Sequence, residues 1–521
     1  MDNRLIVIPA IKKNAVIPDQ LIKKLDGITL IQRAINTAKK ITNKILIITD
    51  SEEISLIAKR NKVEFYFDSR LILNSINIID FVKKITNKRK EQNIILYRAN
   101  TPLVNSSILL EAYKVFLEKD HYILTSVKNL DKQLLKFEDD TLVNSENRYF
   151  EELRAFYIFK NITANGKLRS FIIDEDHSIE IETYQDWWVC EKILQQKIIV
   201  FNVIGSKELG MGHIYHSLAL AHEITDHKVI FVCDKKYGMA VEKIALMDYK
   251  VIPTEDIKKT ILELNPDLVI NDVLNTNLEY IKNLKNNNIK VVNFEDLGCG
   301  TQEADLVINE LYNEPQLKGD NFLWGHQYLA LRDEFEDAKP HKFESNVNAV
   351  LVAFGGTDQN NLTLVALKSI INIAEQNNIK IYIVCGSGYL FKKELERYLS
   401  AHMYKNIEFT LASRVISKIM EKTQIALSSN GRTVYELAHM NIPSIIISHH
   451  KREDSHRFSS LETGFINLGV YGANKTAKSI KTSFNKIVVD NDYRESLFLN
   501  ISKYNFSNNK KKVVKKILEL L

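Results

Sequence analysis

A short glycine segment that ends in a histidine is the part of this sequence best suited to chemistry. The apolar run 198–202 predicts a buried strand, and the apolar residues of 214–224 recur at helical spacing. Gly210 and Gly212 let the backbone approach a ligand closely, and the helix N-terminus beyond them attracts anions such as phosphate. His213 stands at this junction, where an imidazole can accept a proton from water or a hydroxyl. A strand–turn–helix with a surface histidine is an equally good interpretation of the loop alone, because a lone glycine loop is a weak motif.

Two later segments carry residues that could hold the rest of a nucleotide. One follows the strand predicted over 349–354, where paired glycines allow close approach to an anion and Thr357 could cap the next turn. The other follows the strand predicted over 424–427 and opens a helix with an anion-attracting N-terminus. Glu436 lies within that helix, where its carboxylate could accept both ribose hydroxyls or simply favour the first turn. The candidate diphosphate-binding residues are Gly355, Gly356, Thr357, Ser429, Asn430 and Gly431.

Predicted strands and helices alternate along the whole chain, which is typical of α/β folds with parallel sheets. Strands of the first third are predicted over 5–8, 44–50, 63–67 and 93–97. In such sheets ligands bind at the carboxyl ends of the strands. Two comparable series follow from Ile198 onward, so we expect a pair of doubly wound halves around a cleft. The predicted domains are 1–195, 198–340 and 346–521.

Composition narrows the class of protein further. The chain has 521 residues, of which 45% are hydrophobic and 26% charged, as in ordinary globular proteins. The formal charge of +5 is small for this length and does not indicate nucleic-acid binding. No signal-peptide layout and no apolar run of about 18 residues occur. We therefore expect a cytoplasmic protein without stable membrane insertion.

The first third resembles the CMP-sialic-acid synthetase family of cytidylyltransferases. The matching segments are Ile8-Pro-Ala10, Leu25-Asp-Gly-Ile-Thr-Leu-Ile31, Ile48-Thr-Asp-Ser-Glu-Glu-Ile54, Asn100-Thr-Pro-Leu103 and Glu180-Ile-Glu-Thr-Tyr-Gln-Asp186. The last of these stands where the family has a metal-binding Asp-x-Asp followed by Thr-x-x-Asp. The resemblance implies a nucleotidyltransferase-type, Rossmann-like domain that binds CTP and a nonulosonic acid with Mg²⁺.

Several residues of this domain are candidates for that chemistry. Lys12 and Lys13 could supply positive charge for the CTP phosphates, and Asp50 ends a predicted strand near them. Glu180 and Glu182 alternate on a predicted strand, so both point to one face and could hold Mg²⁺ together. A solvated acidic edge is the alternative interpretation of this pair.

Three positions depart from the pattern of the cytidylyltransferases. Ile11 replaces the arginine after Pro-Ala, and Gln20 and Leu21 replace a Lys-Asn pair. A lysine nearby cannot reproduce the bidentate geometry of an arginine. A domain that keeps the fold but has become a silent nucleotide-binding or dimerisation module is therefore an alternative.

The remaining two thirds resemble the UDP-sugar hydrolase of pseudaminic-acid biosynthesis, a relative of GT-B glycosyltransferases. The matching segments are Gly210-Met-Gly-His213, Asp267-Leu-Val-Ile-Asn-Asp272, Ala304-Asp-Leu-Val-Ile-Asn309, Gly325-His-Gln-Tyr-Leu-Ala-Leu-Arg-Asp-Glu-Phe335 and the glycine groups at 355 and 431. The resemblance implies hydrolysis of the sugar–phosphate C–O bond of a UDP-linked 2,4-diacetamido-trideoxyhexose, with no cofactor required. His213 would activate water with Asp272 as its partner, and Glu436 would hold the ribose.

One position departs from the hydrolases, which usually have arginine three residues after the histidine. Here His216 takes that place as a candidate substrate contact, and unlike arginine it could be neutral at pH 7. The main alternative is a GT-B glycosyltransferase in which His213 deprotonates an acceptor hydroxyl.

Together the two resemblances predict a bifunctional enzyme of nonulosonic-acid biosynthesis. One module would release the free amino sugar from a UDP-sugar, and the other would charge the finished acid with CMP. We expect nucleotide sugars rather than nucleic acid as partners, and a homodimer as one assembly of the chain.

Overall fold

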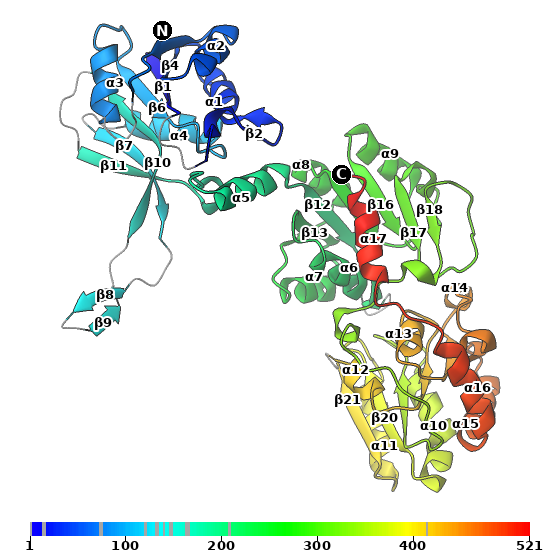
Figure 1. The fold of residues 1–521 in the computed structure, drawn as a ribbon. Helices are drawn as coiled ribbons and strands as arrows, with labels where there is room; N and C mark the ends of the chain where they lie inside the picture. The colour runs from blue at the N-terminus through cyan, green and yellow to red at the C-terminus, as the bar shows by residue number, and fades with distance from the viewer. Residues whose placement is uncertain are drawn as a thin grey trace. The chain divides into compact units, whose positions relative to one another are not determined.

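The computed structural model describes residues 3–12, 17–71, 77–118, 122–130, 135–138, 141–144, 149–161, 167–206, 210–412 and 415–521. The chain divides into two compact units, Met1–Gln196 and Lys197–Leu521 (Figure 1). Each unit is described by itself below as the first and the second unit.

The first unit is built on a mixed sheet. Within the described residues its strand order is β11-β7-β10-β6-β1-β4-β5. β1 pairs in parallel with β4 and β6, whereas β10 runs antiparallel to both β6 and β7, a feature that the expected parallel sheet did not include. The elements are β1 (Arg4–Ala10), β2 (Lys24–Leu25), β3 (Ile28–Thr29), α1 (Leu30–Lys39), β4 (Ile45–Thr49), α2 (Glu52–Arg60), β5 (Glu64–Phe67), α3 (Ile78–Thr86), β6 (Asn93–Tyr97), α4 (Ser106–Leu117), β7 (Tyr122–Asn129), β8 (Leu135–Glu138), β9 (Thr141–Asn144), β10 (Phe150–Lys160), β11 (Lys167–Ile172) and α5 (Tyr184–Gln195).

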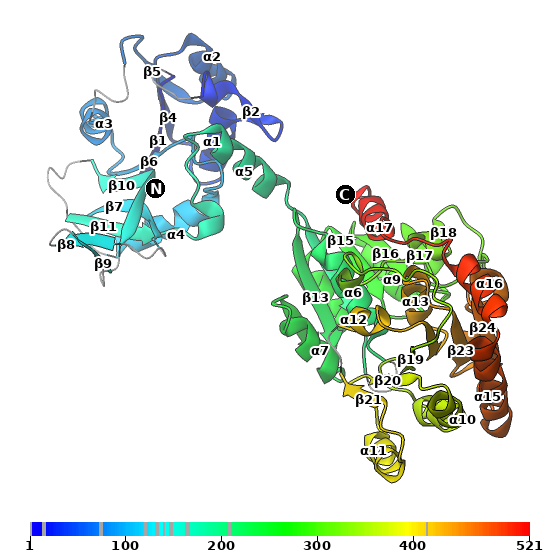
Figure 2. The ribbon, with the colours of Figure 1, turned by 60° about the horizontal axis from the view of Figure 1, so that its bottom comes forward.

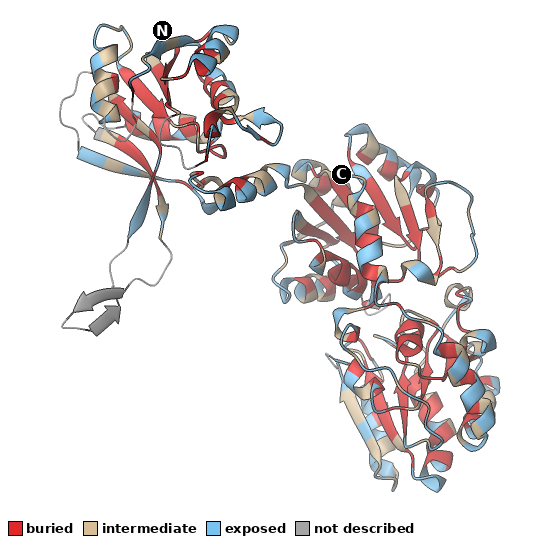
Figure 3. Cartoon of the chain, viewed as in Figure 1, coloured by how far each residue is buried: buried red, intermediate tan, exposed pale blue. Residues whose placement is uncertain are grey.

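Helices cover both faces of this sheet because the central strands are apolar on both sides. Ile6 and Ile8 of β1 pack with residues of α1 and α4, whereas Leu5 and Val7 point to the opposite face, toward α3. Figure 3 shows the buried strands in the middle of each sheet. Strands without alternating polar residues are typical of such two-sided burial.

The second unit consists of two halves, each a parallel sheet flanked by helices (Figure 2). Among the described residues, the first half has the order β14-β13-β12-β15-β16-β17-β18 and the second half β21-β20-β19-β22-β23-β24. The first half comprises β12 (Ile198–Val203), α6 (Gly212–His222), β13 (Lys228–Asp234), α7 (Gly238–Ala245), β14 (Val251–Thr254), α8 (Ile257–Leu264), β15 (Leu268–Asp272), α9 (Leu278–Asn286), β16 (Lys290–Phe294), β17 (Leu306–Asn309) and β18 (Phe322–Trp324). The rest comprises β19 (Ala349–Ala353), α10 (Leu362–Gln376), β20 (Lys380–Cys385), α11 (Lys392–Ala401), β21 (Ile407–Leu411), α12 (Ser417–Met420), β22 (Ile425–Ser428), α13 (Thr433–His439), β23 (Ser444–Ser448), α14 (Lys451–Asp454), β24 (Phe465–Val470), α15 (Ala473–Val489), α16 (Asn491–Ile501) and α17 (Asn509–Leu518). The predicted pair of doubly wound α/β halves is confirmed.

The strand order reverses once in each half, and these points fix where a ligand would bind. β12 lies between β13 and β15, and β19 lies between β20 and β22. Loops leaving adjacent strands at such a switch point diverge to opposite faces and open a crevice at the carboxyl ends.

The last helix, α17, returns from the second half to the first. Its Val513, Val514 and Ile517 pack with Ile214 of α6 in one apolar cluster (Figure 1). The buried Lys510 forms ion pairs with Glu223 at 3.2 Å, Glu336 at 2.5 Å and Asp333. The basic C-terminal segment therefore closes the first half of the second unit. Within the described parts of the chain, no helix combines the length and apolarity needed to cross a bilayer.

Candidate functional site

A cavity of about 630 Å³ lies between the two halves of the second unit. It opens at the carboxyl ends of β12, β15, β19 and β22, where the strand orders reverse. The predicted residues that border it are Gly210, Gly212, His213, His216, Gly355, Gly356, Thr357, Ser429, Gly431 and Glu436. Residues from segments more than 200 positions apart thus meet around one space.

His213 borders this cavity, and Asp272 lies behind it, fully buried and not at the cavity surface. His213 is the second residue of α6, and Asp272 is the last residue of β15. Nδ1 of His213 lies 2.5 Å from Oδ1 of Asp272. Because the carboxylate accepts a hydrogen bond from Nδ1–H, the ring keeps Nε2 as its proton acceptor, the arrangement required of a general base.

Asp272 is fully buried and holds a second histidine through its other oxygen. Nδ1 of His216 lies 2.7 Å from Oδ2, and the hydroxyl of Ser217 donates to the same oxygen at 3.1 Å. Burial alone would raise the pKa of Asp272, but His213 and His216 outweigh it and hold that pKa well below its usual range. The carboxylate therefore stays ionised beside the candidate base.

His216 is positively charged at neutral pH, contrary to the expectation that it could be neutral. Burial acts to lower the pKa of His216, but Glu310 and Asp272 raise it to about 9. Nε2 of its ring lies 3.4 Å from Oε2 of Glu310. The ring borders the cavity but its side chain has 0% exposed surface, so it supports Asp272 rather than presenting a face to a substrate.

The paired glycines lie beside the start of α6. Gly355 has a φ of 78°, a left-handed conformation that favours glycine. A methyl group added to Gly356 would lie 3.6 Å from the backbone nitrogen of Met211. Two glycine-bearing segments from different halves therefore lie close together at the cavity, without side chains between them.

Two predictions in the second half need correction. The side chain of Asn430 is committed to structural hydrogen bonds, because Nδ2 donates to the carbonyls of Glu453 and His456 at 2.9 and 3.0 Å. Asn430 does not border the cavity. Thr357 borders the cavity but does not cap α10, since the carboxylate of Asp358 accepts the first free N–H groups of that helix.

Glu436 lies at the cavity with one oxygen already used. Its Oε1 accepts a hydrogen bond from Nε of Arg332 at 2.7 Å. Its buried Oε2 has no hydrogen-bond partner among the described residues. One ribose hydroxyl could therefore be accepted directly, rather than the two expected from the sequence.

Charged residues that were not predicted also border this cavity, among them Glu295 and Arg432, and Glu310 lies beside Arg432 without bordering the cavity. Glu295 and Glu310 each follow a buried strand directly, and Arg432 precedes α13. Arg432 donates from Nε to Oε1 of Glu310 at 2.8 Å. Burial, followed by the charge of Glu310, raises the pKa of Glu295 to about 8. The sequence feature that could have identified Glu295 and Glu310 is their position directly after a predicted buried strand.

In the first unit, the candidate phosphate-binding residues are already paired. Nζ of Lys12 lies 2.7 Å from Asp19 and 2.6 Å from Glu53. The carboxylate of Asp50 accepts the backbone N–H of Lys12 at 2.8 Å. Lys13 lies outside the described residues. The charge of Lys12 is therefore already balanced by Asp19 and Glu53 rather than available for a phosphate group.

The departures from the cytidylyltransferase pattern have structural roles here. Ile11 and Leu21 are buried in two of the apolar clusters of the first unit. Gln20 is buried and donates from Nε2 to the carbonyl of Ile181 at 2.6 Å. Positions where the related enzymes would contact CTP therefore belong to the core in this chain.

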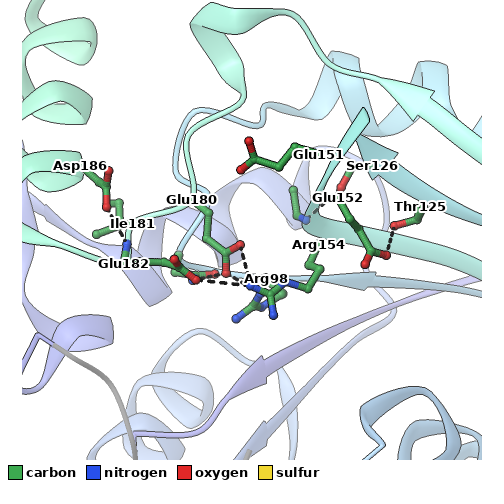
Figure 4. A network of polar contacts seen from close by, with 12 residues as sticks. Arg98, Thr125, Ser126, Glu151, Glu152, Arg154, Glu180, Ile181, Glu182 and Asp186 are labelled. Carbon is green, nitrogen blue, oxygen red and sulfur yellow. Dashed lines mark hydrogen bonds and ion pairs between the residues drawn. The ribbon is translucent and has the colours of Figure 1, made fainter. Parts of the chain in front are cut away.

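The predicted Mg²⁺ pair does not fit a metal ion. Residues 178–182 form no strand, and Glu180 accepts from Arg98 at 2.5 Å and from Asn100 at 3.0 Å (Figure 4). Arg154 lies 3.6 Å from the other oxygen of Glu180 and 3.3 Å from Glu182. Guanidinium groups occupy the positions that a cation would need, and they repel one.

The third acidic residue of the expected metal motif is also committed. Asp186 and Thr183 form a capping box at the start of α5, and Asp186 accepts the backbone N–H of Thr183 at 2.7 Å. Across the described parts of the chain, no group of three or more His, Cys, Asp or Glu side chains is placed to hold a metal.

Comparison with known proteins places the first unit among nucleotidyltransferase folds. Residues 6–230 match the family model for cytidylyltransferases, which extends past Gln196 into the second unit. The chain thus combines a cytidylyltransferase-type domain with a pair of doubly wound α/β halves.

Two curated proteins are similar to parts of the chain. An uncharacterised protein of Methanocaldococcus jannaschii, MJ1062, is 29% identical over 268 residues, which cover 47% of this chain and 54% of that protein. The match therefore spans about half the length of that relative. Post-translational flagellin modification protein B of Campylobacter coli is 25% identical over 207 residues, covering 34% of this chain and 88% of that protein.

Three solved structures show a partial likeness to the chain. MurG of Acinetobacter baumannii is 13% identical with a TM-score of 0.43, and covers 62% of this chain and 99% of its own. HepE of Anabaena in complex with UDP-glucose is 10% identical with a TM-score of 0.44, and also covers 62% and 99%. A CMP:2-keto-3-deoxy-manno-octonic acid synthetase complexed with CTP is 12% identical with a TM-score of 0.30, and covers 37% of this chain and 98% of its own.

Proposed function

We propose that the second unit hydrolyses a UDP-linked diacetamido-trideoxyhexose to the free sugar and UDP. The observation that carries this proposal is His213, which borders the cavity between the halves and lies 2.5 Å from the buried carboxylate of Asp272. In the reaction, Nε2 of His213 accepts a proton from water as the water oxygen bonds to the anomeric carbon. The C–O bond to the phosphate breaks, and its electron pair leaves with UDP.

The rest of the cavity supports the same substrate class. Gly355 and Gly356 border the cavity beside the start of α6, whose N-terminus would stabilise a diphosphate. The free Oε2 of Glu436 provides an acceptor for a ribose hydroxyl. The partial similarity to a flagellin modification protein supports a role in making sugars for surface glycans, with nonulosonic acids as the end product.

The test is to incubate the full chain with a panel of UDP-diacetamido sugars and follow UDP by chromatography. We expect UDP release in water alone, and a loss of about 100-fold or more in His213→Ala. His222→Ala is the matched control, because His222 lies at the far end of the same helix. Full activity without the His213 ring would contradict the proposal, and UDP release only with an added acceptor would assign glycosyl transfer instead.

We infer that the first unit has kept a nucleotidyltransferase fold without Mg²⁺-dependent cytidylyl transfer. Its support is the ion pairing of Glu180 and Glu182 with Arg98 and Arg154. We expect no pyrophosphate from CTP, Mg²⁺ and a nonulosonic acid. Pyrophosphate formation that disappears in Glu180→Gln would overturn this inference and restore the bifunctional enzyme predicted from the sequence.

A further inference from the structure

Arg432 carries a guanidinium group whose hydrogen-bonding capacity is only partly used. Nε donates to Glu310 at 2.8 Å, which fixes the plane of the group. Nη2 is buried and has no hydrogen-bond partner among the described residues. A buried donor without an acceptor destabilises the protein, so such a group is expected to meet an acceptor when the site is filled.

The guanidinium lies where the two halves come closest around the cavity. A methyl group added to Gly212 would lie 3.6 Å from Nη1 of Arg432. Gly212 opens α6 and precedes His213, so the cation stands over the positive end of that helix. The paired glycines approach Met211 from the second half. Donors from both halves therefore converge on one space, beside the candidate base.

The carboxylate of Glu310 explains how the charge of Arg432 is stabilised in a buried position. Glu310 contacts Arg432 through Oε1 and His216 through Oε2, so it joins the two cations. The pKa of Glu310 is lowered because, against burial, His216 and Arg432 favour its ionised form. Glu310 thus orients Arg432 without using the Nη2 edge.

The sequence gives an independent reason to look for a cation at this place. The UDP-sugar hydrolases that the second unit resembles have arginine three residues after the histidine, where this chain has His216. The His216 ring is enclosed by Asp272 and Glu310 and cannot reach a ligand as an arginine would. Arg432 reaches the same cluster of carboxylates from the opposite half.

We propose that Arg432 binds the diphosphate of the nucleotide sugar and stabilises the charge that it gains as the sugar–phosphate bond breaks. This assignment rests on the proposed function of the second unit. The free Nη groups would donate to phosphate oxygens in the fork geometry that arginine provides and lysine lacks. As the C–O bond breaks, its electron pair passes to the phosphate oxygen, while the proton of water passes to His213.

Binding measurements on the full chain separate this role from a structural one. UDP and uridine are titrated by calorimetry into wild type, Arg432→Ala, Arg432→Lys and the control Arg457→Ala, which removes an exposed arginine of the same half. We expect Arg432→Ala to weaken UDP about 100-fold and to leave uridine within about 2-fold, since charged hydrogen bonds to phosphate are the strong ones. Arg432→Lys should lose about 10-fold, and Arg457→Ala should match wild type.

The outcomes distinguish the two levels of the proposal. Equal UDP affinity in wild type and Arg432→Ala would overturn the role of Arg432 alone. Uridine affinity reduced as much as UDP affinity would also overturn it, because a residue that only holds the halves together would affect both ligands. A wild-type protein that binds neither ligand would overturn the proposed function together with this assignment.

Discussion

Replacing Asp272 by asparagine tests the centre of the site most directly. The carboxylate holds Nδ1 of His213 at 2.5 Å and Nδ1 of His216 at 2.7 Å, and it is fully buried. An asparagine has a single acceptor oxygen, so it can hold one ring and must present its NH₂ group to the other. The buried imidazolium of His216 would then lose one of its two counter-charges.

The size of the effect follows from these contacts. Removing one partner of a buried charged pair costs about 3–5 kcal/mol. Because Glu310 still balances part of the charge of His216, we expect the unfolding free energy to fall by about 3 kcal/mol. Turnover should fall by about 10³-fold or more, because the ring of His213 loses the acceptor that fixes its tautomer. Urea unfolding gives the first quantity, and UDP release at saturating substrate gives the second.

The matched control is Asp234→Asn, the same change at the end of β13, a strand of the same sheet that β12 separates from β15. Asp234 pairs with Lys236 at 2.9 Å, is partly exposed and does not border the cavity. We expect less than about 1 kcal/mol of destabilisation there, as for other exposed ion pairs. Near-wild-type turnover in Asp272→Asn would refute the reasoning that His213 depends on this carboxylate.

Three further predictions concern other contacts of the second unit. His216 has a pKa raised from 6.5 to about 9, so its contribution to stability is complete below pH 6.5 and is lost as the pH rises through about 9. The unfolding free energy of the wild type should therefore fall between these two pH values. In His216→Gln this fall should be absent. Glu436→Gln should weaken uridine and UDP by the same factor of about 10, measured by calorimetry, and a loss confined to UDP would contradict a ribose contact. Lys510→Ala should destabilise the second unit by about 2 kcal/mol in urea unfolding, whereas Lys511→Ala, at an exposed position, should have little effect; equal effects would show that the ion pairs of Lys510 add nothing.

Local patterns in the sequence were enough to locate His213 and Asp272. Each lies at the end of an apolar strand or the start of a helix, and the order of strands in a doubly wound sheet brings such ends together. The positive charge of His216 could not be predicted from local patterns in the sequence. It depends on Glu310, which lies 94 positions further along the chain and follows a different strand.

The first unit shows the opposite outcome for the same kind of reasoning. Glu180 and Glu182 have the spacing of a metal pair, but their chemistry is decided by Arg98 and Arg154. Arg154 has a φ of 51° at an irregularity of β10, between the pairs made by Glu152 and Tyr157. The irregularity places three extra residues in β10 relative to β7, and Arg154 within it reaches the carboxylates of Glu180 and Glu182, which no sequence motif records.

The return of α17 makes the chain cross between the halves of the second unit twice. The first crossing follows β18, and the second joins α16 to α17. Lys510, at the second, forms ion pairs with Asp333 and Glu336, at the first. Two covalent connections held together by ion pairs would let the two halves bend toward each other about one axis. They would resist sliding or twisting of one half against the other. We therefore expect the cavity to open by bending about this corner, and we expect a cut in the chain before Lys510 to allow movement in the other directions as well.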